Sequence, residues 1–212
     1  MTEEERIFRG LLFSPGHPEL KKIKRRAHNL SQQYSSTFEE QTEEREDILK
    51  QLLASKGEHC FMQGPIFFHY GVHTEIGDHF FANYNLTVQD DAKVTIGNHT
   101  MFGPNVTIVT PSHPFIAAER QQMIDQHGDI KSLCYAKPVT IGSNVWLSAN
   151  VTVCGGVTIG DGCVIGAGSV VTHDIPENSF AAGVPCKVIR SITDADSMRY
   201  KPEILEDCHI LE

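Results

Sequence analysis

Three polar residues stand out for the chemistry that their side chains allow. His113 lies between Ser112 and Pro114, and an imidazole is well suited to accept a proton near neutral pH. The amide of Asn83 can donate hydrogen bonds to developing negative charge, and the carboxylate of Asp91 accepts hydrogen bonds from hydroxyl groups. Together these groups would suit the removal of a proton from an attacking hydroxyl.

Each of these residues also has a simpler explanation. The chain has 11 histidines, and a histidine in a loop is most often ordinary solvent-exposed surface. An asparagine at a chain corner commonly satisfies backbone groups, which is the interpretation that we prefer for Asn85. Neighbouring acids such as Asp90 and Asp91 are commonly exposed and solvated, although for Asp91 we favour a functional role.

A repeat of six residues determines the expected fold. From Ile141 an aliphatic residue recurs at every sixth position, and an earlier block runs from Ile76 to Ile108 with one step of eight at Asp90-Asp91. Neither a helical nor a two-residue period explains this spacing. One short strand and one corner per repeat would build a triangular coil of 18 residues, whose turns stack about 4.8 Å apart. Ile141 should then lie next to Ile159, and Leu147 next to Ile165.

The remaining segments are expected to be attachments to this β-helix. Residues 1–57 form an N-terminal helical segment, because Leu20, Ala27 and Tyr34 belong to an apolar stripe and a second stripe ends at Gly57, a typical helix stop. Residues 58–191 form the helix of repeats, interrupted by a long loop at 111–138. Excursions of this length are usually functional. Residues 192–212 form a C-terminal tail.

Composition narrows the possible functions. The 18 basic and 27 acidic residues give a formal charge of −9, which disfavours nucleic acid as a partner. We expect neither a signal peptide nor a membrane span, because the first residues are acidic and no apolar run approaches about 20 residues. The six cysteines have no zinc-finger spacing, so we expect reduced thiols and a cytoplasmic location.

Three motifs resemble the galactoside and maltose O-acetyltransferase family of hexapeptide-repeat acyltransferases. They are FFHYGVHTEIGDHFFANYNLT, TPSHP and AAGVPCKVIR, and the similarity covers nearly the whole chain. The resemblance implies a left-handed parallel β-helix, mainly β, and transfer of acetyl from acetyl-CoA directly to a sugar hydroxyl. In these terms His113 is the general base, Asn83 is a catalytic and substrate-binding amide, and Asp91 contacts the sugar acceptor.

The resemblance also implies a coenzyme site and an assembly. Family members are homotrimers with active sites between subunits, and no metal is expected. At position 69 the galactoside enzymes have a serine that touches the acceptor, where this chain has His69, and an aspartate expected in the N-terminal loop is replaced in Ser14-Pro15-Gly16. Because both changes alter the acceptor pocket, the sequence does not determine which sugar is the acceptor. The implied coenzyme A contacts are Ala149, Ala167, Thr172, His173, Lys187 and Arg190.

Three other functions remain as alternatives. The first is an acetyltransferase for a non-sugar acceptor, such as an antibiotic or serine. The second is a zinc protein of the γ-carbonic anhydrase type, since His79 and His99 fall at equivalent places on adjacent coils, although the repeat supplies no obvious third ligand. The third is a non-catalytic trimeric scaffold, which would leave His113, Asn83 and Asp91 without a shared purpose.

Overall fold

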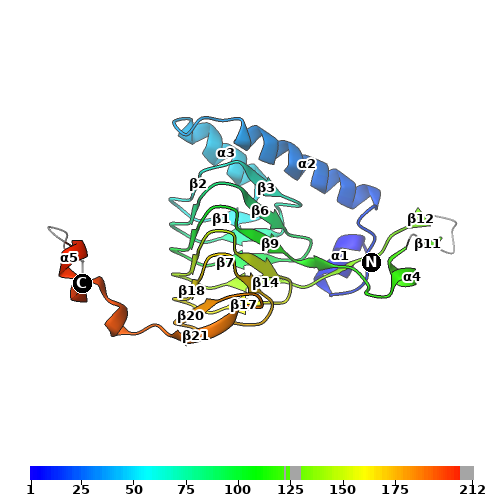
Figure 1. The fold of residues 1–212 in the computed structure, drawn as a ribbon. Helices are drawn as coiled ribbons and strands as arrows, with labels where there is room; N and C mark the ends of the chain where they lie inside the picture. The colour runs from blue at the N-terminus through cyan, green and yellow to red at the C-terminus, as the bar shows by residue number, and fades with distance from the viewer. Residues whose placement is uncertain (122, 125–129, 206–212) are drawn as a thin grey trace.

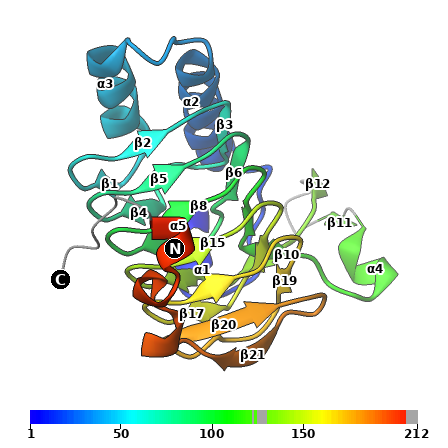
Figure 2. The same ribbon diagram turned by 60° about the vertical axis from the view of Figure 1, so that its left-hand side comes forward.

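A parallel β-helix forms the body of the protein, as the sixfold repeat predicts. The computed structural model describes residues 1–121, 123–124 and 130–205. Short strands stack into three flat faces around an apolar centre, and helices lie across one end (Figures 1 and 2). In the described part of the chain, no helix is long and apolar enough to cross a membrane.

Each of the first five coils contributes one strand to each face, and the second face continues with two further strands. The first face is β1 (Ser55–Lys56), β4 (Thr74–Ile76), β7 (Val94–Ile96), β14 (Val139–Ile141) and β17 (Thr158–Ile159). The second is β2 (Phe61–Met62), β5 (Phe81–Ala82), β8 (Met101–Phe102), β15 (Trp146–Leu147), β18 (Val164–Ile165), β20 (Ser179–Ala182) and, antiparallel to β20, β21 (Lys187–Ser191). The third is β3 (Ile66–Phe68), β6 (Leu86–Gln89), β9 (Thr107–Val109), β16 (Thr152–Cys154) and β19 (Val170–Val171).

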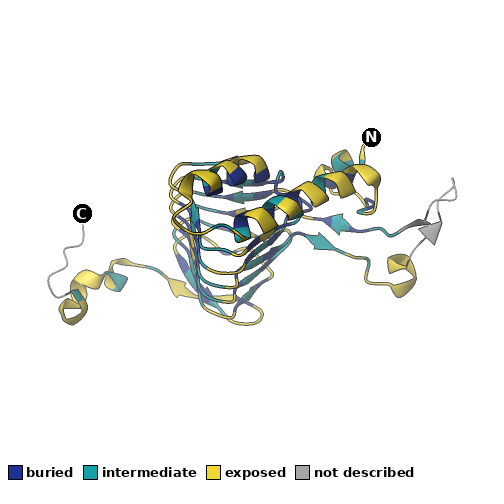
Figure 3. Ribbon diagram, turned by 90° about the horizontal axis from the view of Figure 1, so that it is seen from above, coloured by how far each residue is buried: buried dark blue, intermediate teal, exposed yellow. Residues whose placement is uncertain are grey.

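The register between coils is the one that the repeat predicts. Ile141 pairs with Ile159, and Leu147 pairs with Ile165. The column of aliphatic side chains also continues across the long loop, because Ile96 pairs with Ile141 on the next coil. The stacked side chains are buried in one continuous core (Figure 3).

The corners need backbone conformations that few residues adopt. Asn85, Asn105 and Asn150 have φ values of 62°, 60° and 59°, in the left-handed region that asparagine tolerates better than most residues. Their side chains form a ladder, in which the amide of Asn85 donates to Asn105 over 2.9 Å and that of Asn105 donates to Asn150 over 3.0 Å. Asn85 thus lies at a corner, as expected, but its side chain bonds the asparagine of the next coil rather than backbone groups.

Two N-terminal helices close the open end of the β-helix. They are α2 (Pro18–Ser35) and α3 (Thr42–Leu52), whereas α1 (Glu3–Phe8) lies beside the solenoid, where Glu4 contacts His73 over 3.0 Å. The hydroxyls of Ser31 and Ser35 on α2 accept hydrogen bonds from Phe68 N–H at 3.2 Å and Ile66 N–H at 3.1 Å. These bonds satisfy donors on β3, the terminal strand of the third face, which would otherwise be an unpaired edge.

One expectation for this segment is wrong. Helix α3 ends at Leu52, and Gly57 follows β1 inside the first coil rather than stopping the helix. A Cβ atom at Gly57 would lie 2.5 Å from the backbone nitrogen of Asp78. Glycine is needed there because adjacent coils approach too closely for a side chain.

The long loop and the tail project from the solenoid at opposite ends of the view in Figure 1. The loop contains β10 (Pro111–Ser112) paired antiparallel with β13 (Tyr135–Ala136), β11 (Met123–Ile124) paired with β12 (Ile130–Lys131), and α4 (Ala117–Arg120). The tail contains η1 (Asp194–Asp196), η2 (Met198–Tyr200) and α5 (Pro202–Leu205). Parts of the loop and tail expectations fall on residues 122, 125–129 and 206–212, outside the described residues.

We expect Leu147→Ala to lower the free energy of unfolding by about 2–5 kcal/mol, because it leaves a cavity in the stacked core. Leu147 is fully buried, whereas Thr158 points outward from β17. Thr158→Ala is the matched control and should change stability by less than about 0.5 kcal/mol. Urea denaturation of both variants at one protein concentration tests this expectation. Equal losses would contradict the assignment of Leu147 to the core.

Candidate functional site

The residues predicted to meet the acceptor lie along the third face and at the corners on either side of it. Asn83 follows β5 at the corner between the second and third faces, and Asp91 follows β6 at the corner between the third and first faces. His69 follows β3 on the outside of the same face. His113 follows β10, which continues outward from β9. Strands β3, β6 and β9 of the third face therefore position His69, Asp91 and His113, whereas β5 of the second face leads to Asn83.

His113 has a defined tautomer in this geometry. Its Nδ1 atom lies 3.3 Å from the carbonyl oxygen of Leu133, on the opposite arm of the loop. Because a carbonyl only accepts hydrogen bonds, Nδ1 carries the proton in this contact, and the lone pair of the neutral ring is then on Nε2. The side chain is exposed, so Nε2 can reach a ligand as a base.

Asn83 has spare hydrogen-bond donors. Its side-chain oxygen accepts from the backbone N–H of Tyr84 at 2.8 Å, and its own backbone N–H donates to Phe102 at 2.9 Å. Among the residues described, the side-chain NH2 group has no acceptor. The amide is therefore oriented by its oxygen while its two donors remain available.

The two acids of the bulge are buried, so the simpler explanation of solvated side chains is wrong for them. Asp90 accepts from the backbone N–H of Tyr70 and from the hydroxyl of Thr74, each at 2.7 Å. Asp91 is only 2% exposed. In the described part of the chain, Asp91 Oδ2 and the Tyr70 hydroxyl are buried without a hydrogen-bond partner, and a ligand hydroxyl would satisfy such atoms.

Burial also changes the acidity of Asp91. Loss of hydration, with the negative charge of Asp90 as the second cause, raises the pKa of the Asp91 carboxyl to about 6. The Lys24 ammonium opposes this rise. Desolvation in turn lowers the pKa of Lys24. Burial of the charged Asp91 carboxylate thus costs free energy in the folded protein.

His69 lies against α2 rather than standing alone on the third face. Its Nδ1 atom is 3.2 Å from Nε2 of His28. Burial, followed by the nearby Lys24 ammonium and His28, lowers the pKa of His69 to about 4. The sequence analysis did not identify Lys24 and His28 as neighbours of the site. The sequence feature that could have indicated them is their spacing, since these polar residues lie four positions apart beside the apolar stripe of α2.

The candidate coenzyme residues are divided between two corners and β21. Ala149 and Ala167 stack one coil apart, where the N–H of Gly168 donates to the carbonyl of Ala149 at 2.9 Å. At the next corner, the hydroxyl of Thr172 lies 2.9 Å from Nδ1 of His173. Small side chains at the first corner leave the backbone accessible to a thin ligand.

The two basic candidates differ in their availability. Lys187 is exposed on β21. Arg190 forms a bidentate ion pair with Asp196 at 2.6 and 2.7 Å, and this contact lowers the pKa of Asp196 to about 2. Arg190 would have to exchange Asp196 for a phosphate group before binding it.

The histidines considered for zinc form a stack. His59, His79 and His99 occupy one corner on successive coils, with ring centroids 4.8 and 4.7 Å apart and interplanar angles of 22° and 8°. The repeat therefore supplies a third histidine, contrary to expectation. Parallel rings place their nitrogens side by side rather than around a common centre, and Zn–N bonds are only about 2.0–2.1 Å. Among the described residues, no three or more histidine, cysteine or acidic side chains are arranged to hold a metal ion.

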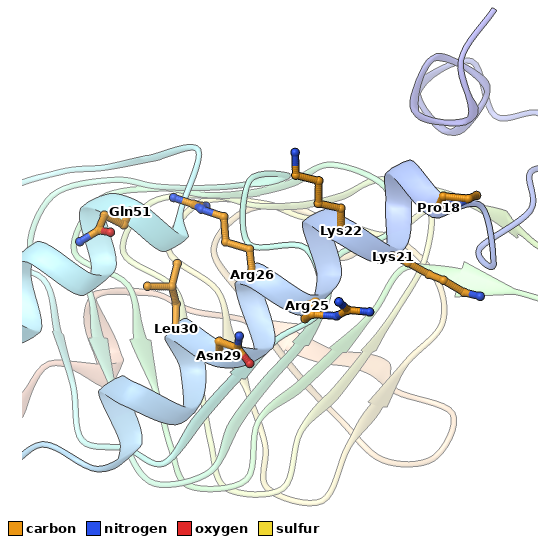
Figure 4. A pocket seen from close by; sticks show the side chains of 8 residues that line it. All are labelled: Pro18, Lys21, Lys22, Arg25, Arg26, Asn29, Leu30 and Gln51. Carbon is orange, nitrogen blue, oxygen red and sulfur yellow. The ribbon is translucent and has the colours of Figure 1, made fainter.

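A cavity of about 620 Å³ lies along the outer side of α2, away from these residues. Figure 4 shows four cationic side chains spreading outward from α2, with Gln51 of α3 on the far side. None of the predicted site residues lines this cavity. Its cations are Lys21, Lys22, Arg25 and Arg26.

We expect Asp91→Asn to stabilise the protein at pH 7 by about 1–3 kcal/mol, following a pKa raised from 3.8 to about 6. Between pH 3.8 and about pH 6 the Asp91 carboxyl of the wild type is protonated in the folded state and ionised in the unfolded state. The free-energy cost of the buried carboxylate therefore grows as the pH rises and is complete above about pH 6. The stabilisation by Asp91→Asn should vanish below about pH 4, where Asp91 is protonated in both the folded and the unfolded wild type. Denaturation at pH 4 and pH 7 tests this dependence, and an equal gain at both would contradict it.

Comparison with known proteins identifies the family. Residues 138–173 match the bacterial transferase hexapeptide family (six repeats), and residues 6–57 match the maltose acetyltransferase hexapeptide capping motif. The chain is 41% identical to a galactoside O-acetyltransferase of Escherichia coli (strain K12) over 94% of each chain.

Two solved structures are similar throughout. A galactoside acetyltransferase in complex with coenzyme A has 42% identity and a TM-score of 0.84, covering 92% of this chain and 94% of its own. A maltose O-acetyltransferase from Clostridium difficile 630 has 39% identity and a TM-score of 0.80, with coverage of 92% and 99%. The chain therefore belongs to the galactoside and maltose O-acetyltransferase family of hexapeptide-repeat, acetyl-CoA-dependent acetyltransferases.

Proposed function

We propose that this protein transfers the acetyl group of acetyl-CoA to a hydroxyl group of a glycoside. Membership of the family supports the reaction class, and the coenzyme A complex of a relative supports the acetyl donor. The observation that carries the proposal is the His113 imidazole, which the Leu133 carbonyl orients and whose Nε2 has no hydrogen-bond partner among the described residues.

In the proposed reaction, Nε2 of His113 removes the proton of the acceptor hydroxyl as its oxygen attacks the thioester carbonyl. The side-chain NH2 of Asn83 donates to the oxygen that becomes negative. When the carbon–sulfur bond breaks, the imidazolium returns the proton to the departing thiolate. Asp91 and His69 bind other hydroxyl groups of the acceptor and hold it in place.

The coenzyme would lie along the later coils. Backbone groups at Ala149 and Ala167 permit close approach of its pantetheine arm, while Lys187 offers positive charge to phosphate. Arg190 would join after it releases Asp196. Thr172 and His173 complete the proposed set, and we place the reaction in the cytoplasm.

An exposed apolar column supports a homotrimer with active sites between subunits. On the second face, Met101 and Trp146 pair side by side and are 50% and 47% exposed. Equivalent outward positions on the first face are polar, as at Thr95 and Thr140. An apolar column along one flat face suits contact with another copy of the chain. Its members are Phe61, Phe81, Met101, Trp146, Val164 and Phe180.

We expect His113→Ala to lower kcat by about 10²–10⁴-fold, the usual contribution of a general base. Coenzyme A affinity should remain within about twofold, because the imidazole acts on the acceptor proton. Release of free thiol from acetyl-CoA with a glycoside acceptor measures the rate, and calorimetry measures coenzyme binding. Near-normal turnover would show that another group is the base.

Light scattering should give about three times the chain mass of 23.6 kDa. Trp146→Glu should lower this mass, because a charge in an apolar interface is unfavourable. Thr140→Glu, in the same coil but on the first face, is the matched control and should stay trimeric. A wild-type mass near 24 kDa would contradict the assembly, and equal behaviour of the variants would contradict the assigned face.

A further inference from the structure

Helix α2 brings a second histidine to the candidate acceptor position. His28 faces the outer side of β3, where its ring centroid lies 5.1 Å from that of Phe67 and 5.3 Å from that of His69. Nε2 of His28 and Nδ1 of His69 are 3.2 Å apart. His28 is the side chain of α2 that links the helix to residue 69 by a hydrogen bond.

The surroundings keep this histidine pair neutral. Burial lowers the pKa of both rings, and the positive charge of Lys24, one turn earlier on α2, lowers both further. The negative charge of Asp91 also acts on Lys24, in the direction that raises the pKa of the Lys24 ammonium. In a neutral pair, one ring donates its N–H and the other accepts it with a lone pair.

The hydrogen bond also restricts His69. It occupies Nδ1, and the ring of Tyr70 packs edge-on against His69 with centroids 5.2 Å apart and an interplanar angle of 83°. Nε2 is the remaining polar atom, and it has no hydrogen-bond partner among the described residues. Whichever ring donates, the proton position on His28 decides whether Nε2 of His69 offers a donor or an acceptor.

We infer that His28 is a positioning residue for acceptor binding, holding His69 so that its Nε2 meets an uncharged acceptor hydroxyl. The inference rests on the proposed function, in which residue 69 contacts the acceptor. A lone histidine in place of the family serine would be free to turn away from the sugar. The partner on α2 removes that freedom and makes the pair, rather than His69 alone, the determinant of specificity.

Three single variants separate this role from simple packing. His28→Ala should raise the KM for a glycoside acceptor about five- to tenfold, the usual effect of one lost hydrogen bond, with kcat and the KM for acetyl-CoA within about twofold. His28→Gln retains a side chain that can hydrogen-bond Nδ1 and should recover part of the affinity. Asn29→Ala, the adjacent exposed position on α2, is the matched control and should match wild type.

A double-mutant cycle gives the decisive comparison. If His28 acts through His69, then His28→Ala should have no further effect on the acceptor KM in a His69→Ser background. The same fold-change in both backgrounds would overturn the inference and assign His28 a packing role. A change in kcat or in the KM for acetyl-CoA as large as the change in the acceptor KM would overturn it too.

A measurement without turnover keeps this test separate from the proposed function. In an NMR titration of the histidine rings, His28→Ala should move the pKa of His69 upward from about 4, because the ring loses part of its shielding from water. An unchanged titration would contradict the contact itself. If the wild type acetylated no glycoside while the pKa still moved, the proposed function would fail and the histidine pair would stand.

Discussion

The stacking of equivalent residues in successive coils is the constraint on which this structure depends. Parallel strands in register place each aliphatic side chain about 4.8 Å from its counterpart in the next coil. A shift of one residue would turn the whole column toward solvent. The strand register is therefore the same on both sides of the long loop, and Ile96 and Ile141 pair directly although 45 positions separate them in the sequence.

This rigid stack explains where the candidate site can form. Corners are the only places where the chain can carry extra residues without breaking the column. The bulge at Asp90-Asp91 and the loop with His113 both leave the corner between the third and first faces. The candidate base His113 and the buried carboxylate of Asp91 thus lie at two interruptions of the repeat, which leave the same corner on adjacent coils.

Helix α2 joins the stability of the fold to the chemistry of the site. Ser31 and Ser35 satisfy the backbone of β3, while Lys24 and His28, earlier on the helix, approach Asp91 and His69. The helix that closes the end of the solenoid therefore also covers Asp91 and His69, the residues proposed to bind the acceptor. The raised pKa of Asp91 and the lowered pKa of His69 arise from this closure, because both groups lose water beneath the helical segment.

The coils, their register and the apolar stripe of α2 could all be predicted from the amino-acid sequence, because each depends on a period that neighbouring residues carry. The pairing of Leu147 with Ile165, for example, follows from counting residues. The sequence also marked His113, Asn83 and Asp91, whose roles remain predictions.

In contrast, the coil position of Gly57, the burial of Asp91 and the contact of His28 with His69 became visible only in the folded chain. These features depend on contacts between segments about 20 to 40 positions apart, as between Gly57 and Asp78 or His28 and His69. A repeat of a few residues does not predict contacts between segments so far apart in the sequence. Burial and hydrogen-bond partners, which set the acidity and orientation of a side chain, are properties of the packed molecule rather than of the residue.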